Sequence, residues 1–182
     1  MLLRFRSGWI AVISDAEKAF LQVYLHEDDR DVTRLLCVKD IDKDFSGDNI
    51  MVVRFTRVLF GLNVSPFLLA ATINHHLETI EDQDMAHKMS NNLFLDNLLM
   101  TTDLNTESAF KLYSYPKETF TDMGMNLCVF TTNSKERRKM IPIEDRSEET
   151  TPKVLGIPWD IDEDQLVMKV KLDDCKSGKC EY

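Results

Sequence analysis

The chain has 182 residues, 43% of them hydrophobic, so it can bury the core of one ordinary domain or of two small lobes. Its 22 lysines and arginines stand against 31 aspartates and glutamates, and the net charge of -9 excludes a protein that holds nucleic acid by overall charge. Four cysteines (Cys37, Cys128, Cys175 and Cys180) form neither a dense disulfide framework nor a Cys-x-x-Cys zinc site, which indicates a reducing compartment.

The apolar stretch at the N-terminal end is short. Residues 9–13 are too few for the core of a signal peptide, and no run approaches the roughly 20 apolar residues of a membrane span. The sequence therefore predicts an intracellular protein, cytoplasmic or nuclear, with no signal peptide, transmembrane segment or membrane partner.

Strand patterns dominate the first third of the chain. The β-branched residues in 10–13 favour a strand that ends at Asp15, and residues 16–21 are typical of a helical turn. Two strand-like runs, 33–38 and 50–55, flank a polar loop at 40–49. This arrangement predicts a β-hairpin.

Helix signals follow. Ser65 and Pro66 predict the start of a helix that continues to about residue 80, with Ser65 as its cap. Residues 93–100 form two short apolar runs around Asp-Asn, which predicts a tight hairpin. A second helix is predicted from a cap at Asn105 to residue 123, and Pro116 should kink or split it.

The C-terminal part is more polar. Residues 135–152 are highly charged and predict a loop, residues 153–159 predict a short apolar element, and the last dozen residues predict a frayed end. Strands and helices in this order indicate an α+β fold.

Three features could carry chemistry: a carboxylate at the end of a strand (Asp15), a Phe-Gly-Leu-x-x-Ser-Pro loop that opens a helix (60–66), and a carboxylate at a hairpin tip (Asp96). Each alone has an ordinary structural explanation. A strand-terminal aspartate is more often a cap than a ligand, an Asp-Asn hairpin is usually only a turn, and Gly before Ser-Pro usually only starts a helix. Only the order and spacing of the three features along the sequence distinguish them from such ordinary structural positions.

Together these motifs resemble the reverse transcriptase domain of BEL/Pao-type LTR retrotransposons. Residues 15–22 are similar to the first palm motif, 58–66 to the second, and 94–97 to the Tyr-x-Asp-Asp box. Residues 125–134 and 154–160 are similar to the motifs that follow. The resemblance covers roughly residues 2 to 160.

The resemblance implies a polymerase palm, an antiparallel sheet backed by helices, over residues 1–153, with a β-rich remnant of the fingers at about 24–59. It implies a primer-grip-like element followed by the start of a thumb or a disordered tail over residues 154–182. The activity implied is RNA-directed DNA polymerisation by two-metal nucleotidyl transfer, with Mg²⁺ or Mn²⁺, deoxynucleoside triphosphates and an RNA/DNA template-primer as ligands. In such a transfer, two divalent ions about 4 Å apart stabilise the attacking and leaving oxygens.

The resemblance also assigns residues. Asp15 and Asp96 correspond to the metal ligands, because hard carboxylate oxygens suit Mg²⁺, and Asn97 completes the catalytic set. The remaining positions would contact substrate: Phe20 under the incoming sugar, Phe60 and Gly61 on the nucleotide or template face, and Leu155 and Gly156 near the primer terminus. Gln22 is a further candidate substrate contact, although a residue of this kind more often lies on a solvated helix surface.

Three departures from the family bear on activity. Asn97 replaces the usual second aspartate, Leu59 replaces the proline before Phe-Gly, and the sequence begins almost at the first palm motif, without the N-terminal fingers that clamp the triphosphate. Since positioning and charge stabilisation both need that surface, we expect little or no polymerase activity from this chain alone. Two alternatives stay open: a decayed or domesticated palm without catalysis, and a binding module on the same scaffold.

Overall fold

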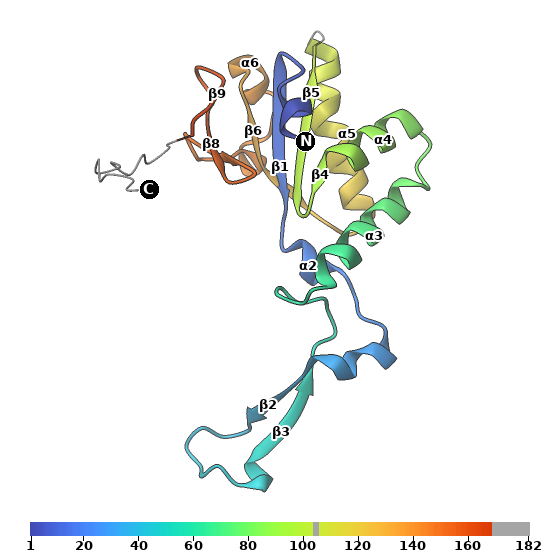
Figure 1. Ribbon diagram of the computed structural model, residues 1–182, viewed down its shortest axis with the longest axis vertical. Coiled ribbons are helices and arrows are strands. Elements are labelled where there is room, and N and C mark those ends of the chain that lie inside the picture. Colours follow the sequence, from blue (N-terminus) through green and yellow to red (C-terminus); the bar gives the residue numbers. More distant parts are fainter. Residues whose placement is uncertain (104–105, 169–182) are drawn as a thin grey trace, which may run out of the picture. The chain divides into compact units, whose positions relative to one another are not determined.

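The computed structural model describes residues 1–103 and 106–168, and they divide into two compact units, Met1–Ser147 and Glu148–Tyr182. Among the described residues, the first unit contains the helices and two antiparallel sheets, and the second contains one small antiparallel sheet (Figure 1). The mixture of helices and antiparallel sheets fits the α+β fold class that the sequence predicts. Along the described residues, no helix is long and apolar enough to cross a membrane.

The central sheet of the first unit has four strands in the order β4-β5-β1-β6. Their bounds are Leu93–Phe94 for β4, Asn97–Thr102 for β5, Ile10–Ala16 for β1 and Leu127–Thr132 for β6. All three pairings are antiparallel, and β1 lies between β5 and β6. The predicted strand before Asp15 and the predicted hairpin at 93–100 are thus confirmed, and they are neighbours in one sheet.

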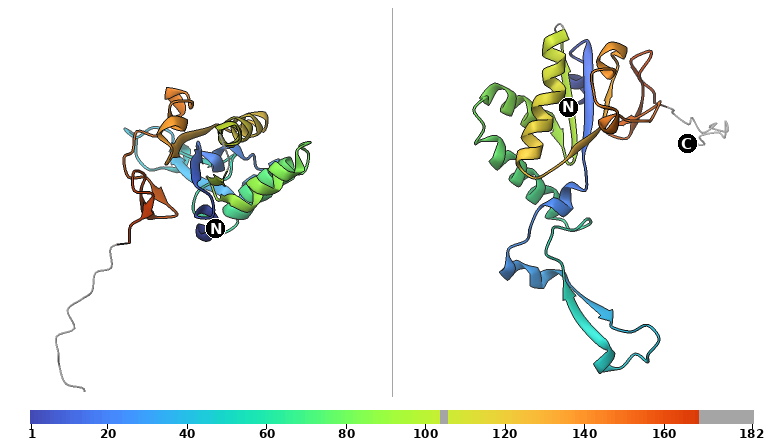
Figure 2. Two further views of the ribbon diagram at one scale, coloured as in Figure 1. Left: turned by 90° about the horizontal axis from the view of Figure 1, so that it is seen from above. Right: turned by 180° about the vertical axis from the view of Figure 1, so that it is seen from behind.

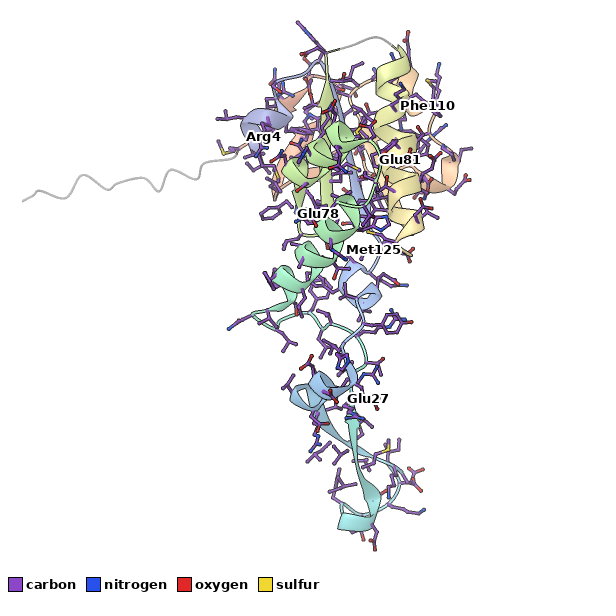
Figure 3. All side chains as sticks on the ribbon, turned by 90° about the vertical axis from the view of Figure 1, so that its right-hand side faces the viewer. Arg4, Glu27, Glu78, Glu81, Phe110 and Met125 are labelled. Carbon is purple, nitrogen blue, oxygen red and sulfur yellow. The ribbon has the colours of Figure 1, made fainter. Side chains whose placement is uncertain are left out.

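One face of this sheet is buried under three helices: α3 (Ser65–Leu77), α4 (Gln83–Asn92) and α5 (Thr106–Asp122). Because side chains alternate along a strand, Val12, Leu98 and Met100 point to this face and join the hydrophobic core. Figure 2 shows these helices from above and from behind, and Figure 3 marks the α3–α4 connection by Glu78 and Glu81.

A short N-terminal helix, α1 (Leu2–Phe5), packs against β5. The chain then passes so close to β5 at Gly8 that a Cβ there would lie 2.8 Å from the backbone nitrogen of Thr102. Phe5 is buried in the same region. Glycine is therefore the residue that allows the chain to enter β1 along this path.

The predicted hairpin after the first motif is also confirmed. Strands β2 (Arg34–Val38) and β3 (Ile50–Arg54) pair antiparallel as a separate two-stranded sheet, with the 3₁₀ turn η1 (Glu27–Thr33) before it and η2 (Gly47–Asn49) in its loop. Asn49 is buried and closes the loop, since its amide nitrogen donates to the carbonyl oxygens of Asp40, Lys43 and Asp44. The helical turn after Asp15 is shorter than predicted: α2 spans only Ala19–Gln22.

Three sequence predictions about helices need correction. The helix α4 was not anticipated, because its composition is polar; Asp82 caps it by accepting from the backbone nitrogen of Met85 at 3.0 Å. Ser65 does not cap α3. Its hydroxyl donates to the carbonyl oxygen of Leu59 at 2.5 Å, and Val64 occupies the cap position.

The third correction concerns Pro116, which does not split α5. The helix is continuous through the proline. Proline removes one backbone hydrogen bond, but Leu112, Pro116 and Phe120 follow one another at helical spacing and are all buried, so packing holds the helix together. The predicted cap at Asn105 lies outside the described residues.

The charged stretch 135–152 is not the plain loop that its composition predicts. It contains the helical turn α6 (Lys135–Arg138) and the 3₁₀ turn η3 (Ile143–Asp145). Ser134 caps α6, since its hydroxyl accepts from the backbone nitrogen of Arg137. Local capping in a charged segment explains why composition alone was misleading.

The second unit contains a small antiparallel sheet of β7 (Lys153–Val154), β8 (Ile157–Asp160) and β9 (Gln165–Leu166), which confirms the predicted apolar element. Leu155 and Gly156 link β7 to β8 with φ of 50° and 84°, the pattern of a type I′ turn. Trp159 is buried and its indole nitrogen donates to Asp164 at 3.0 Å. The predicted frayed end, with Cys175 and Cys180, lies outside the described residues.

Candidate functional site

The two predicted carboxylates lie at the same end of the central sheet. Asp15 is the cross-strand partner of Asn97, the residue that follows Asp96. The backbone nitrogen of Ala16 donates to the carbonyl oxygen of Asp96 at 2.7 Å, so the end of β1 is tied to the β4–β5 turn. Residues separated by nearly half of the chain are therefore adjacent.

The β4–β5 turn holds its backbone in a rarely used conformation. Phe94 pairs with Asn97, which leaves a two-residue loop of Leu95 and Asp96, and Leu95 has φ 56°. A left-handed conformation disfavours a branched residue such as leucine by roughly 1–2 kcal/mol. Two-residue hairpin loops commonly require positive φ, so the tightness of the β4–β5 turn accounts for this conformation.

Partial burial and the nearby charge of Asp96 both disfavour the ionised form of the Asp15 carboxyl. The pKa of Asp15 is raised from 3.8 to about 6, first because the carboxyl is partly buried and second because the Asp96 charge lies nearby. A proton on Asp15 or a cation between the two carboxylates would offset the repulsion of their charges.

Asn97 acts on Asp96 directly. Its side-chain nitrogen donates to Oδ1 of Asp96 at 2.8 Å. The amide therefore orients the carboxylate and adds no negative charge to the site, whereas the second aspartate of the resembled motif would add one. Asp15, Asp96 and Asn97 thus form one cluster.

A β-bulge in β6 brings Cys128 to this cluster. Between Ile13 and Asp15 the β1–β6 register shifts by one residue, and Val129 in the bulge has φ 54°. Cys128 is then the partner of Asp15, and its thiol lies 3.6 Å from the Asp15 carbonyl oxygen. Burial and the Asp15 charge raise the pKa of this thiol. The sequence contains no local signal for this contact.

A polar network supports the ends of β1 and β6. The Lys117 ammonium donates to the Asn126 side chain at 2.8 Å, to the Leu127 carbonyl oxygen at 2.6 Å and to Asp145 at 2.6 Å. Asn126 in turn donates to the Glu17 carboxylate at 3.1 Å. The network reaches from α5 to within two residues of Asp15, and sequence reasoning missed it because its members are scattered along the chain.

The structure brings two predicted substrate contacts together. The rings of Phe20 and Phe60 lie 4.4 Å apart at an angle of 60°. Phe20 is 3% exposed and Phe60 is 70% exposed, so a buried ring supports a solvent-facing one. Gly61 has φ 88° and open space around it, so the dihedral favours glycine here.

The remaining predicted contacts are Gln22, on the same helical turn as Phe20, and Leu155 and Gly156. Gln22 ends α2, half-buried, and its carbonyl oxygen accepts from the guanidinium of Arg57 at 3.2 Å. The same guanidinium lies 3.3 Å from the ring centroid of Tyr24. Leu155 and Gly156 belong to the second unit, where they form the β7–β8 turn.

The number and kind of ligand side chains determine which metal ion the cluster could bind. Within 1–103 and 106–168, no group of three or more His, Cys, Asp or Glu side chains could hold a metal ion by itself. Mg²⁺ is commonly held by only one or two carboxylates, with water and substrate phosphates as the remaining ligands. The Asp15–Asp96 pair fits that mode of binding and no closed, all-protein site.

No family model matches the chain, and no curated protein matches it.

Proposed function

We propose that this chain is the palm of a BEL/Pao-type reverse transcriptase, in which Asp15 and Asp96 hold Mg²⁺ or Mn²⁺ for RNA-directed DNA synthesis. The observation that carries the proposal is the juxtaposition of these two carboxylates at one end of an antiparallel sheet. They lie 81 positions apart in the sequence, and the β1–β5 register brings them together.

Each residue of the cluster has a distinct part in the proposed reaction. The metal ions would supply charge stabilisation to the attacking and leaving oxygens of nucleotidyl transfer. Asp15 and Asp96 bind them, and Asn97 keeps the Asp96 carboxylate in one orientation through its hydrogen bond. The Ala16–Asp96 backbone hydrogen bond holds the two ligand-bearing segments in register.

The remaining contacts extend the same proposal. Phe60, supported by Phe20, offers an exposed aromatic surface for the sugar or base of a nucleotide or template. Gln22 lies on the same helical turn as Phe20. Leu155 and Gly156 would serve at the primer terminus. Residues 24–59, in the first unit, would be the fingers remnant. Template-primer and deoxynucleoside triphosphates are the proposed ligands.

A second candidate is a palm that has lost catalysis and acts as a binding module. Asn97 favours it, because an amide stands where the resembled motif carries a second carboxylate and is already engaged with Asp96. Metal binding and polymerisation are separate properties. Separate measurements of metal binding and of polymerisation therefore distinguish the two candidates.

The first experiment measures Mn²⁺ binding to the full chain by electron paramagnetic resonance. We expect saturable binding that Asp15→Asn and Asp96→Asn each weaken by about tenfold or more. Asp44→Asn is the matched control, because Asp44 is an exposed aspartate in the β2–β3 loop. Equal Mn²⁺ binding in all four proteins would remove the metal site from the proposal.

The second experiment measures primer extension on an RNA template with a DNA primer, Mg²⁺ or Mn²⁺ and one deoxynucleoside triphosphate. Product that disappears in Asp96→Ala supports the polymerase. Product that survives Asp96→Ala excludes Asp96 as a ligand. Mn²⁺ binding at Asp15 and Asp96 without any product favours the inactive palm.

A further inference from the structure

Asn126, the residue before β6, holds the chain just after β1. Its carbonyl oxygen accepts from the backbone nitrogen of Glu17 at 2.8 Å. Its side-chain nitrogen donates to the Glu17 carboxylate at 3.1 Å. Asn126 therefore contacts both the backbone and the side chain of Glu17, which lies two positions after Asp15.

Lys117 fixes the orientation of the Asn126 side chain. The Lys117 ammonium donates to Oδ1 of Asn126 at 2.8 Å, so the amide nitrogen faces Glu17. An ammonium has three donors, and the other two serve the Leu127 carbonyl oxygen and the Asp145 carboxylate, both at 2.6 Å. The Lys117 side chain is 23% exposed and that of Asp145 is 10% exposed. The Asn126 amide is thus held by a partly buried anchor and cannot turn without losing both of its side-chain hydrogen bonds.

The end of β1 is held from its other edge by the β4–β5 turn. The backbone nitrogen of Ala16 donates to the carbonyl oxygen of Asp96 at 2.7 Å. Successive backbone N–H groups of a strand point to opposite edges, which explains why Ala16 bonds toward β5 and Glu17 toward β6. The position of Asp15 relative to Asp96 therefore depends on contacts at both edges of β1.

The β1–β6 pairing is irregular where it approaches the site. The register shifts between Ile13 and Asp15, and a bulge disrupts the ladder of hydrogen bonds locally. Beyond the shift, the pairing continues for two residue pairs, to Ala16. Because the ends of elements open locally more easily than their centres, the side chain of Asn126 adds a contact at the point where the ladder is weakest.

We propose that Asn126, fixed by Lys117, is a positioning residue for Asp15. By holding Glu17 against the start of β6, it keeps the end of β1 in place, and with it the backbone hydrogen bond that brings Asp15 beside Asp96. Asn126 acts through the chain at Glu17 and does not itself bind the ion. The consequence for metal affinity rests on the proposed function, in which residues that support the ligands commonly set the affinity.

Hydrogen exchange of the full chain, followed by nuclear magnetic resonance, tests the first step. Asn126→Ala removes the side-chain contact, so the Ala16 amide should exchange about tenfold faster, the effect of losing one ordinary hydrogen bond. The fold should survive, because Asn126 is exposed and lies outside the hydrophobic core. The Ala11 amide, bonded to the Asn133 side chain at the other end of β1, should exchange as in the wild type.

A reversal of the hydrogen-bonded pair isolates the contact with Glu17. Asn126→Asp keeps an acceptor for Lys117 but places a carboxylate against Glu17, so exchange of the Ala16 amide should again rise. Adding Glu17→Gln supplies a donor to that carboxylate, and exchange should return to within about twofold of the wild type. Asn74→Ala is the matched control, because Asn74 also accepts a side-chain hydrogen bond, at 2.7 Å, but between α3 and α4.

Mn²⁺ binding to the same proteins, measured by electron paramagnetic resonance, tests the second step. Affinity should fall about tenfold in Asn126→Ala. It should stay near that of the wild type in the double variant Asn126→Asp with Glu17→Gln, whose net charge equals that of the wild type.

Two results overturn the proposal. One is exchange of the Ala16 amide that is unchanged in both Asn126→Ala and Asn126→Asp, or that Asn74→Ala raises equally. The other is faster exchange in Asn126→Ala without any loss of Mn²⁺ affinity. A wild type that binds no Mn²⁺ would instead contradict the proposed function, and the Ala16 exchange would still decide whether Asn126 holds the end of β1 in place.

Discussion

The surroundings of the Asp15 carboxyl disfavour its ionised form. Its pKa in the folded chain is about 6, above the ordinary 3.8, so the folded state binds a proton more tightly than the unfolded state. The stabilising contribution of the protonated group is complete below about pH 4 and is lost as the pH rises through 6. Near neutral pH, the ionised carboxylate therefore destabilises the fold.

Because the ionised Asp15 carboxylate destabilises the fold near neutral pH, the first prediction concerns Asp15→Asn. At pH 7.5 the variant should be more stable than the wild type by about 1 kcal/mol, allowing for the partial exposure of the side chain. At pH 4 the two proteins should have the same free energy of unfolding, apart from the small effect of the amide itself. Urea denaturation at both pH values measures the difference. An equal gain at both pH values would contradict a charge effect.

The Asp15 titration also predicts how metal binding depends on pH. A bound cation favours the ionised carboxyl, so Mn²⁺ affinity should fall as the pH drops below about 6 and protons compete. Isothermal titration at pH 5 and pH 7.5 checks this. Affinity that is equal at the two pH values would place the ion elsewhere.

Lys117 and Asp145 form a partly buried pair at the end of β6, with N–O distance 2.6 Å. The Tyr113 hydroxyl also donates to Asp145 at 2.8 Å. Lys117→Met would leave the Asp145 carboxylate with one partner fewer in a buried position, which should destabilise the chain by about 2–4 kcal/mol. Adding Asp145→Asn should recover part of that loss, and thermal denaturation of the two single variants and the double variant measures the coupling. Strictly additive losses would show that the pair is not coupled.

At the scale of elements, a β-bulge in β6 and the β4–β5 turn position the residues of the candidate site. The bulge at Val129 sets the register that pairs Cys128 with Asp15, and the left-handed Leu95 turns the chain tightly enough to place Asp96 beside Ala16. Both residues adopt positive φ although neither is glycine. Such positions follow from what the surrounding sheet imposes, and side-chain identity gives no sign of them.

The fit of α1 against β5 gives the next prediction. At Gly8, a Cβ would lie 2.8 Å from the nitrogen and 2.9 Å from the carbonyl carbon of Thr102, both backbone atoms that cannot move alone. Gly8→Ala should therefore destabilise the chain by about 1–3 kcal/mol. Gly47→Ala is the matched control, because nothing lies within 4 Å of a Cβ there. Equal melting temperatures for the two variants would show that the chain does not approach β5 at Gly8 as closely as described.

At the scale of the whole molecule, the two units differ in their cores. All the residues of the main hydrophobic core lie between Val12 and Ile141, inside the first unit. A chain that ends at Ser147 should therefore unfold cooperatively, within a few degrees of the full-length protein. Differential scanning calorimetry of both proteins checks this, and a broad, non-cooperative transition for the shorter one would contradict it.

Local patterns in the sequence were enough to predict β1, the β2–β3 hairpin, the hairpin around Asp96 and the existence of α3 and α5. They were enough because alternation, turn residues and proline act within a few residues. They were insufficient for α4, which is polar, and for Ser65 and Pro116, where a contact with Leu59 and burial between Leu112 and Phe120 override local preference. Element boundaries and caps depend on such neighbours.

The sequence by itself therefore determined β1, the two hairpins, α3 and α5, and its resemblance to a known family identified Asp15, Asp96, Asn97, Phe20 and Phe60 as candidate residues. Only the tertiary structure decided that Asp15 lies beside Asn97, that Cys128 and the Lys117 network adjoin the pair, and that Leu36 and Val52 of the β2–β3 hairpin are exposed. The reason is physical: these contacts join residues far apart in the chain, and the packing of the whole sheet sets strand register and burial.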